Sequence, residues 1–315
     1  MLTSQTIRSA HARIKPYIHR TPVFSCKNLD DITGGKLFFK CENFQKVGAF
    51  KMRGAANAVL QLTPEELERG VATHSSGNHA QALALAAKDN GAKAYIVMPE
   101  NSPQVKVNAV MGYGAEVILC TSTLEAREST LAEVMQRTGA VFIPPFNDER
   151  IIAGQATAAL ELIEDVPNLD MIIAPVGGGG LLSGTALSAH YFSPGTKVIG
   201  AEPAGADDAF KSFYSGTRVT AHTPKTLADG LQTTLGDIPF AIIQEWVSGI
   251  AICSEATIVT AMKLTWERMK IIIEPSSAVP LGAILDGNID VKGKRVGIII
   301  SGGNVDLDKR PWIKS

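Results

Sequence analysis

Short apolar runs alternate with amphipathic segments along almost the whole chain of 315 residues. Segments with helical spacing of apolar residues cover 79–90, 102–113, 125–139 and 258–269. The apolar runs predicted as strands are 36–42, 71–76, 93–99, 115–120, 141–146, 171–176, 197–202 and 296–303. Several of them are continuously apolar, which is typical of strands covered on both faces. Strands and helices alternating at this spacing form right-handed crossovers, so the sequence predicts an α/β fold with doubly wound parallel sheets.

One stretch of strand–helix units is compact and has its own Gly and Pro punctuation. It predicts a smaller domain over residues 67–146. This domain would be inserted between two parts of a larger one, formed by residues 1–66 and 147–315. Neither a repeat at solenoid spacing nor a low-complexity linker interrupts the pattern.

Composition excludes several classes of protein. The chain has 30 Lys and Arg against 31 Asp and Glu, and this balance argues against a nucleic-acid-binding protein. No apolar run reaches the roughly 18 residues of a membrane span, and the N-terminus lacks the apolar core of a signal peptide. The four cysteines are scattered and form no CxxC, as expected of buried thiols in a reducing compartment. We therefore expect a cytoplasmic protein without a membrane partner.

The first chemically informative motif is QKVGAFKMRGA at 45–55. Lys51 follows Phe50 and stands at a predicted helix start. A lysine whose amine is neutral can form a Schiff base with an aldehyde. Arg53 is close enough in sequence for us to expect that it lowers the pKa of Lys51. The alternative is an ordinary solvated lysine.

The second motif, HSSGNHAQA at 74–82, joins a strand to a helix. The strand ends at Ser75, the chain turns at Ser76 and Gly77, and a helix begins near His79. A helix N-terminus offers free N–H groups, so an anion such as a carboxylate fits there. Asn78 can donate a hydrogen bond to a ring oxygen. The alternative is an ordinary capped turn.

The third motif, VGGGGLLSG at 176–184, places four glycines between a strand and a helix. Their amides can point into one concavity and hold a phosphate group. A tight turn is one alternative. A dinucleotide-binding unit is another, because Glu202 ends the next strand. That fingerprint would need a glycine where the chain has Leu182.

Two further motifs are weaker. In EPAGADD at 202–208, Glu202 and Asp208 are oxygen ligands that could hold Mg²⁺, Mn²⁺ or Ca²⁺, although acidic loops are usually just solvated. In IIISGGNVD at 298–306, Ser301 ends a buried strand, and its hydroxyl could bond to a heterocyclic nitrogen.

Taken in order, these motifs resemble the fold-type II pyridoxal-phosphate enzymes of the tryptophan synthase β-like fold. Within them the chain is similar to the branch that contains serine racemases and serine/threonine dehydratases. The motifs are Phe-Lys-x-Arg-Gly-Ala, Ser-Ser-Gly-Asn-His, the four glycines with leucine, and Ser-Gly-Gly-Asn. The resemblance extends from about Ile18 to Asp306, and the stretches 19–23, 152–155, 227–230 and 273–278 also share it.

The resemblance implies that pyridoxal 5′-phosphate is the cofactor. Lys51 would hold it covalently, Phe50 would pack against its ring, Asn78 would bond to the ring O3′, and Ser301 would meet the pyridine nitrogen. Gly230 would lie along the cofactor edge. The residues that would wrap the phosphate with their amides are Gly177, Gly178, Gly179, Gly180 and Leu181.

The resemblance also implies an amino acid substrate. Its carboxylate would bind at the loop that contains Ser75, Ser76, Asn78 and His79, while Arg127 and Thr233 match positions that approach the substrate in racemases. Racemisation needs a proton donor on the face opposite Lys51, and Ser76 is the residue that we assign to it. Many threonine dehydratases carry alanine at this position. The alternative role for Ser76 is that of a turn serine.

The expected activity is interconversion of L- and D-serine together with dehydration of serine, and of threonine or 3-hydroxyaspartate as further candidates. An ammonia-lyase without racemisation is the alternative within the family, and Phe146 favours it because vertebrate racemases carry asparagine there. Two different functions stay open at this point: a dinucleotide-binding protein, and a sulfur-transfer enzyme of the same fold.

The resemblance implies three more features. A divalent metal would be held by Glu202, the Ala206 carbonyl and Asp208. The protein would be a homodimer whose smaller domain closes over the substrate. A nucleotide effector is a further candidate: Tyr113, Lys270 and Asn304 match positions of the mammalian effector site, whereas Cys26, Lys27 and Val47 depart from it.

Overall fold

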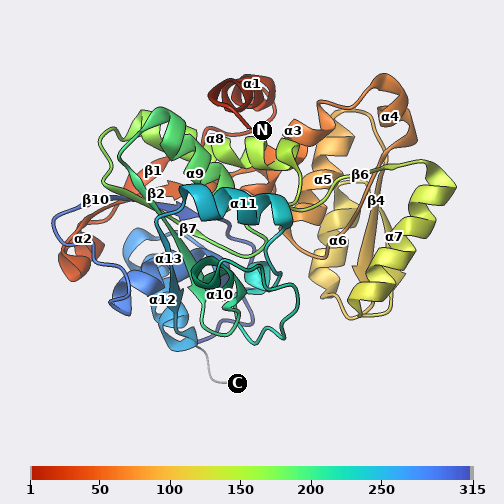
Figure 1. The fold of residues 1–315 in the computed structure, drawn as a ribbon. Coiled ribbons are helices and arrows are strands. Elements are labelled where there is room, and N and C mark those ends of the chain that lie inside the picture. Colours follow the sequence, from red (N-terminus) through yellow and green to blue (C-terminus); the bar gives the residue numbers. More distant parts are fainter. Residues whose placement is uncertain (1, 313–315) are drawn as a thin grey trace.

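A computed structural model describes residues 2–312 and contains two sheets within them (Figure 1). Neighbouring strands are parallel, except that β1 runs antiparallel to β2 at one edge of the larger sheet. This confirms the predicted α/β architecture with two parallel sheets. In spatial order, the larger sheet consists of β1 (Val23–Ser25), β2 (Lys36–Cys41), β10 (Arg295–Ile300), β7 (Met171–Pro175), β8 (Lys197–Pro203) and β9 (Gly249–Cys253). The smaller sheet consists of β5 (Glu116–Cys120), β4 (Ala94–Pro99), β3 (Val71–His74) and β6 (Val141–Phe142).

Helices cover both faces of the larger sheet, as Figure 1 shows. Apolar side chains of α8, α9 and α11 form the core on one face, and those of α12 and α13 form the core on the other. The helices outside the smaller sheet are α1 (Ser4–Ile14), α2 (Lys27–Thr33), α3 (Lys51–Val59), α8 (Glu149–Asp165), α9 (Gly180–Phe192), α10 (Asp208–Ser215), α11 (Asp237–Trp246), α12 (Glu255–Met269) and α13 (Pro275–Leu285). Short 3₁₀ turns are η1 (Glu42–Phe44), η2 (Lys46–Gly48) and η3 (Asp229–Leu231).

The smaller sheet and its helices form a second lobe, on the right of Figure 1. Its helices are α4 (Pro64–Arg69), α5 (Asn78–Asp89), α6 (Gln104–Gly112) and α7 (Leu124–Thr138). None of the helices in the described part of the chain combines the length and the apolar character that a membrane crossing requires.

The predicted strands are present, although several are shorter than expected. The run at 141–146 forms a strand only over Val141–Phe142. Pro144 and Pro145 follow, and proline has no N–H group to donate to a neighbouring strand. The short edge strand β1, strand β9 and the long helix α8 were not expected from the sequence pattern.

Helices α3 and α8 cross at backbone contact, because glycines face each other there. A Cβ atom on Gly154 would lie 2.5 Å from the Arg53 carbonyl oxygen and 2.6 Å from the Gly54 Cα. A Cβ atom on Gly54 would overlap with the side-chain amide of Gln155. The crossing therefore fixes α3, and with it Lys51 at its first position, against the large lobe.

A buried cluster of charges joins the same elements. Arg53 of α3 donates to Glu42, with 2.7 Å from Nε to Oε2, and to Glu161 of α8, with 2.8 Å from Nη2 to Oε2. Lys40 of β2 lies 2.6 Å from the same Glu161 oxygen, and all four side chains are at most 1% exposed. Burial opposes ionisation of Glu161, but hydrogen bonds from His11 and Arg53 outweigh it and hold the pKa of that carboxyl well below its usual range. Two cations and two anions thus compensate one another.

We predict that Arg53→Met lowers the free energy of unfolding by about 3–5 kcal/mol, because it leaves two buried carboxylates with one cation. Arg20 is the control: it pairs with Glu164 and Asp165 at the surface, with its side chain 47% exposed. Arg20→Met is expected to cost less than about 1 kcal/mol. Urea unfolding of the two variants measures the difference, and equal losses would contradict the role of the cluster.

Candidate active site

Lys51 lies where the two lobes meet. Its ammonium group donates a 2.7 Å hydrogen bond to the carbonyl of Pro145, in the segment that leaves the smaller sheet. The preceding residue, Phe50, donates its backbone N–H to the Ser301 carbonyl at 2.9 Å, so Lys51 is held beside the carboxyl end of β10. Burial lowers the pKa of Lys51 to about 8, with the charge of Glu274 opposing the shift. Much of this amine is therefore neutral near pH 8, as a nucleophilic lysine requires.

The expectation that Arg53 lowers the pKa of Lys51 is wrong. The guanidinium points away into the charge cluster, where two carboxylates neutralise it. Desolvation of the Lys51 amine causes the shift instead.

Glu274 is a buried carboxylate to which no role was assigned from the sequence. It accepts two hydrogen bonds from the Asn78 side-chain nitrogen, each 3.1 Å long. The Asn78 oxygen accepts in turn from the Asn304 side chain at 2.9 Å. Burial raises the pKa of Glu274 to about 7, and the charge of Asp229 adds to the shift. This chain of hydrogen bonds ties the start of α5 in the small lobe to the large lobe.

The predicted substrate loop lies between β3 and α5. Helix α5 begins after Gly77, which has no side chain to cap it, so the amides of its first turn remain open to an anion. The Gly77 N–H reaches the Ser75 hydroxyl at 3.4 Å. Ser76 is half-buried, and its hydroxyl has no hydrogen-bond partner within residues 2–312.

His79 is buried at the start of α5 and is neutral. Its Nε2 lies 3.0 Å from the Ile143 carbonyl, which can only accept, so this nitrogen carries the proton. Burial, together with the charge of Lys51, lowers the pKa of His79 to about 3. The other ring nitrogen, Nδ1, is buried without a hydrogen-bond partner in the described chain. A carboxylate at this loop would therefore meet backbone amides rather than a charged imidazole.

The glycine segment 177–180 has no room for side chains. A Cβ atom on Gly177 would lie 2.9 Å from the Leu231 Cα, and one on Gly178 would overlap with the Phe146 ring. Gly179 has a φ of +91°, which favours glycine. Helix α9 begins directly after it without a side-chain cap, so the first amides of α9, including that of Leu181, are available to a phosphate group. The segment fits the phosphate of the predicted cofactor.

The residues predicted along the cofactor ring are gathered around the start of α13. The Gly230 amide donates to the Ser276 hydroxyl at 3.1 Å. The Ser301 hydroxyl lies 2.9 Å from that of Ser277. Local sequence contains a usable signal here, since an acid followed by proline and two serines at 274–277 is typical of a helix start. The structure thus brings Lys51, Asn78, Gly230, Ser301 and the glycine segment 177–180 to one place.

Arg127 lies on α7 and Thr233 in the segment after η3; burial, together with the charge of Arg127, lowers the pKa of His74 next to the substrate loop. Arg127 is half-buried near the start of α7, where its Nε donates to the Thr123 carbonyl at 3.3 Å. Thr233 is exposed in the segment between η3 and α11. Among residues 2–312, neither side chain makes a hydrogen bond or an ion pair to Lys51 or to the glycine segment.

Lys106 of α6 forms an ion pair with Asp229 of η3, with 2.5 Å between Nζ and Oδ2. Gly230 follows Asp229 directly, so this pair links the small lobe to the predicted edge of the cofactor.

The predicted metal loop follows β8 and is buried. Both oxygens of Glu202 accept backbone N–H groups at the start of α10, from Ala209 at 2.9 Å and from Phe210 at 2.8 Å. Burial raises the pKa of Glu202 to about 9. A carboxylate that is 0% exposed and caps a helix cannot hold the ribose of a dinucleotide.

Asp208 has a carboxylate oxygen that is available to bind a cation. One oxygen, Oδ2, accepts the Leu235 amide at 3.3 Å, while the other, Oδ1, is buried without a hydrogen bond. Ala206 is buried beside it. Within residues 2–312, no three His, Cys, Asp or Glu side chains form a metal site by themselves. A cation here would need a carbonyl oxygen or water as well, which is common for Mg²⁺ and Ca²⁺.

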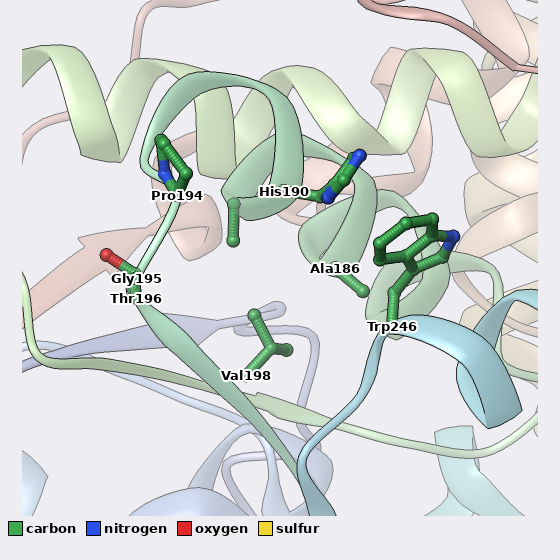
Figure 2. Close-up of a pocket in the computed structure, with 8 residues that line it drawn as sticks. Ala186, His190, Pro194, Gly195, Thr196, Val198 and Trp246 are labelled. Atoms are coloured by element: carbon green, nitrogen blue, oxygen red, sulfur yellow. The ribbon is translucent and has the colours of Figure 1, made fainter.

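A surface cavity of about 220 Å³ lies elsewhere, between α9, β8 and the end of α11 (Figure 2). The rings of His190 and Trp246 face each other at its edge, with their centroids 3.7 Å apart. Its lining is otherwise formed by Ala186, Ala189, Pro194, Gly195, Thr196 and Val198, all different from the predicted site residues.

We predict that Glu274→Gln lowers the pKa of Lys51 below that of the wild-type protein, because it removes the carboxylate that favours the charged amine. The pH dependence of labelling of Lys51 by an amine-reactive reagent, followed by mass spectrometry on the cofactor-free protein, measures this pKa. The labelling profile should move to lower pH. Glu267→Gln, an exposed change on α12, is the control and should leave the profile unchanged. An unchanged profile in Glu274→Gln would contradict the electrostatic contact.

The geometry agrees with comparisons to known proteins. The chain matches the family described as pyridoxal-phosphate dependent enzyme over residues 14–302. It is 54% identical over 311 residues to a serine racemase of Dictyostelium discoideum, covering 97% of this chain and 96% of the relative. It is 50% identical over 310 residues to a beta-hydroxyaspartate dehydratase of Paracoccus denitrificans, covering 98% of both.

The solved structure of maize serine racemase has a TM-score of 0.95 to this chain at 46% identity, covering 97% of this chain and 94% of the maize one. These matches overturn the dinucleotide-binding alternative. The chain belongs to the family of pyridoxal-phosphate-dependent enzymes.

Proposed function

We propose that this protein is a pyridoxal-phosphate-dependent serine racemase that also dehydrates serine, and threonine or 3-hydroxyaspartate as further substrates. The observation that carries the proposal is the pairing of a buried lysine with the glycine segment 177–180, which has no side chains. Relatives named serine racemase and beta-hydroxyaspartate dehydratase, at 54% and 50% identity, support both activities.

The geometry of the site supports the proposed cofactor contacts. Amides of the segment 177–181 hold the phosphate, Lys51 holds the cofactor covalently, and Phe50, Asn78 and Gly230 lie around its ring. When bound, pyridoxal phosphate withdraws electrons from the attached amino acid and acidifies its Cα–H. Ser301 offers a neutral hydroxyl to the ring nitrogen. A neutral hydroxyl would not stabilise a protonated ring nitrogen as a carboxylate does, so the cofactor would withdraw electrons less strongly, which favours prompt reprotonation at Cα or loss of the β-hydroxyl.

Lys51 is the proposed base on one face of the substrate. Once released from the cofactor, its amine can take the Cα proton, and the Pro145 carbonyl is placed to hold the ammonium that results. The amides at the start of α5 orient the substrate carboxylate, with Ser75 and His79 shaping the loop around them. Neutral His79 adds no charge that would compete for the carboxylate.

Ser76 is the proposed proton donor on the opposite face. Its hydroxyl is half-buried and keeps its hydrogen-bonding capacity free in the described chain. Return of the proton from this side inverts Cα, whereas loss of the β-hydroxyl leads to the 2-oxo acid and ammonia. Arg127 and Thr233 are proposed to approach the substrate from α7 and from the segment after η3.

A divalent cation at Glu202, the Ala206 carbonyl and Asp208 is proposed as a structural support. Mg²⁺, Mn²⁺ and Ca²⁺ suit these oxygen ligands. Asp208 binds the Leu235 amide, and the next amide, that of Gly236, donates to the Gly178 carbonyl at 3.2 Å. The cation would therefore stabilise the position of Gly178 in the phosphate-binding segment, through Asp208, Leu235 and Gly236.

Further proposals concern assembly and regulation. We propose a homodimer in the cytoplasm, with residues 67–146 as a small domain that closes over the substrate and residues 1–66 and 147–315 as the large domain. The ion pair between Lys106 and Asp229 would stabilise the closed form. A nucleotide effector is proposed near Tyr113, Lys270 and Asn304, where the Asn304–Asn78 hydrogen bond offers a direct path to the site.

An ammonia-lyase without racemisation is the second candidate. The packing of Phe146 against Gly178 favours it, because this phenylalanine is the dehydratase-like residue of the sequence. A chiral assay of purified enzyme with L-serine, pyridoxal phosphate and Mg²⁺, with pyruvate followed in parallel, decides between them. D-serine alongside pyruvate supports the racemase, and pyruvate alone supports the lyase.

We predict that Ser76→Ala lowers kcat/KM for racemisation at least about 100-fold, the usual scale of general acid–base catalysis. Dehydration of L-serine should change less than about threefold, because Lys51 alone serves that face. Ser129→Ala, on the exposed side of α7, is the control and should alter neither reaction. Normal racemisation by the Ser76→Ala enzyme would remove the second-base role.

A further inference from the structure

Val47 has a backbone conformation that a β-branched residue rarely adopts. Its φ is +56° and its ψ is 14°, in the left-handed region that favours glycine. The Gly48 amide closes this turn with a 2.8 Å hydrogen bond to the Gln45 carbonyl. The buried Gln45 side chain accepts from the His19 amide at 2.9 Å and donates to the His19 carbonyl at 2.7 Å. Backbone strain of this kind persists only where its surroundings fix it, and it is concentrated in functional segments.

The carbonyl of Val47 accepts a hydrogen bond from the side chain of Asn304. The distance from Asn304 Nδ2 to the Val47 oxygen is 2.7 Å, and the same nitrogen lies 2.9 Å from Asn78 Oδ1. The contact is close, because a Cβ atom on Gly48 would lie 2.7 Å from Asn304 Oδ1. The neighbouring backbone is held as well, since the Gly303 amide donates to the Gly48 carbonyl at 2.9 Å. Both N–H groups of the Asn304 side chain therefore have acceptors.

These contacts determine which way two side-chain amides face. A backbone carbonyl only accepts hydrogen bonds, so the atom of Asn304 that faces Val47 is the nitrogen. The same nitrogen faces Asn78, so the atom of Asn78 on that side is the oxygen. The Asn78 nitrogen is left for the other side, where it donates to both oxygens of Glu274 at 3.1 Å. The Asn78 amide is thus held in one orientation by a series of contacts that begins at the Val47 carbonyl.

We propose that Asn304 is a positioning residue that keeps the N–H groups of Asn78 turned toward the cofactor ring, and that the strained Val47 supplies the carbonyl that holds Asn304. The inference rests on the proposed function, in which Asn78 donates to the O3′ of pyridoxal phosphate. A hydrogen bond donated to an ionised oxygen favours the ionised form. With the Asn78 amide reversed, O3′ would meet a carbonyl oxygen and would keep its proton.

The test uses the whole chain loaded with pyridoxal phosphate, without any nucleotide. In Asn304→Asp the carboxylate can only accept, so it draws the N–H groups of Asn78 toward itself. The absorption spectrum reports the state of O3′, because a neutral phenol absorbs at shorter wavelength than its anion. We expect the ratio of the short- to the long-wavelength band to rise at least about fivefold, the scale of a lost hydrogen bond to a charged group.

A second variant separates orientation from charge. Asn304→Ala removes the donor without adding a carboxylate, so Asn78 is free to turn, and the band ratio should rise at least about twofold. In Val47→Gly the left-handed conformation and the carbonyl are kept, because glycine adopts this conformation without strain. The band ratio of this variant should equal that of the wild-type protein.

The matched control is Asn288→Ala. The Asn288 side chain also donates to a backbone carbonyl, that of Ile252 at 3.0 Å, but makes no hydrogen bond to Asn78 or Asn304 in the described part of the chain. Its loss should leave the band ratio unchanged. Unfolding temperatures of the cofactor-free proteins measure the purely structural cost of each substitution.

The outcomes distinguish this inference from the proposed function. A lower unfolding temperature of the Asn304 variants with an unchanged band ratio would reduce Asn304 to a structural residue. A rise in Asn304→Asp alone, and not in Asn304→Ala, would assign the effect to the added charge and overturn the inference. A raised ratio in Val47→Gly would show that the valine side chain acts, rather than its carbonyl. Absence of cofactor absorption in the wild-type protein would overturn the proposed function, and this inference with it.

Discussion

The guanidinium of Arg53 holds together the part of the fold from which the site is built. It lies two residues after Lys51 and is bonded to carboxylates of η1 and α8, while Lys40 completes the charge balance from β2. Rotation or sliding of α3 would separate these charges in an environment without water, where an unpaired charge costs several kcal/mol. The position of the Lys51 amine is therefore set by contacts on the far side of its own helix.

From this fixed point the site is completed by elements of both lobes. The large lobe contributes the glycine segment, the start of α13 and the end of β10. Serine hydroxyls at the start of α13 form hydrogen bonds to the Gly230 amide and to Ser301 at the end of β10. The small lobe contributes the start of α5, linked to the large lobe through Asn78, Glu274 and Asn304. Two titratable groups act on Lys51 or are affected by it: His79 is neutral, and burial raises the pKa of Glu274 to about 7.

The sequence predicts the sheets well, because continuous apolar runs and helical periodicity are local signals. It also indicates residues that follow strand ends, such as Ser76 in the smaller sheet and Gly178 and Ser301 in the larger one, because parallel strands bring such residues to the carboxyl edge of each sheet. It does not indicate Glu274 or the Arg53–Glu161 pair, which spans 108 positions, because such partners are determined by tertiary packing. The same limit explains the wrong assignment for Arg53: proximity in sequence to Lys51 suggested an influence that its buried carboxylate partners cancel.

The contact between Gly54 and Gly154 has a consequence for how enzymes of this architecture can diverge. A methyl group on Gly154 would overlap with the backbone of α3, and one on Gly54 would displace the Gln155 side chain and crowd the Ile151 carbonyl of α8. Substitution of either glycine would therefore disturb the crossing of α3 and α8 that holds Lys51 in place. New substrate preference must arise in the segments that surround the amine without carrying it: the loop at 75–79, the turn around Phe146 and the strand-to-helix connections of the small lobe. The part of the site that carries Lys51 therefore tolerates few substitutions, whereas the surrounding loops tolerate more.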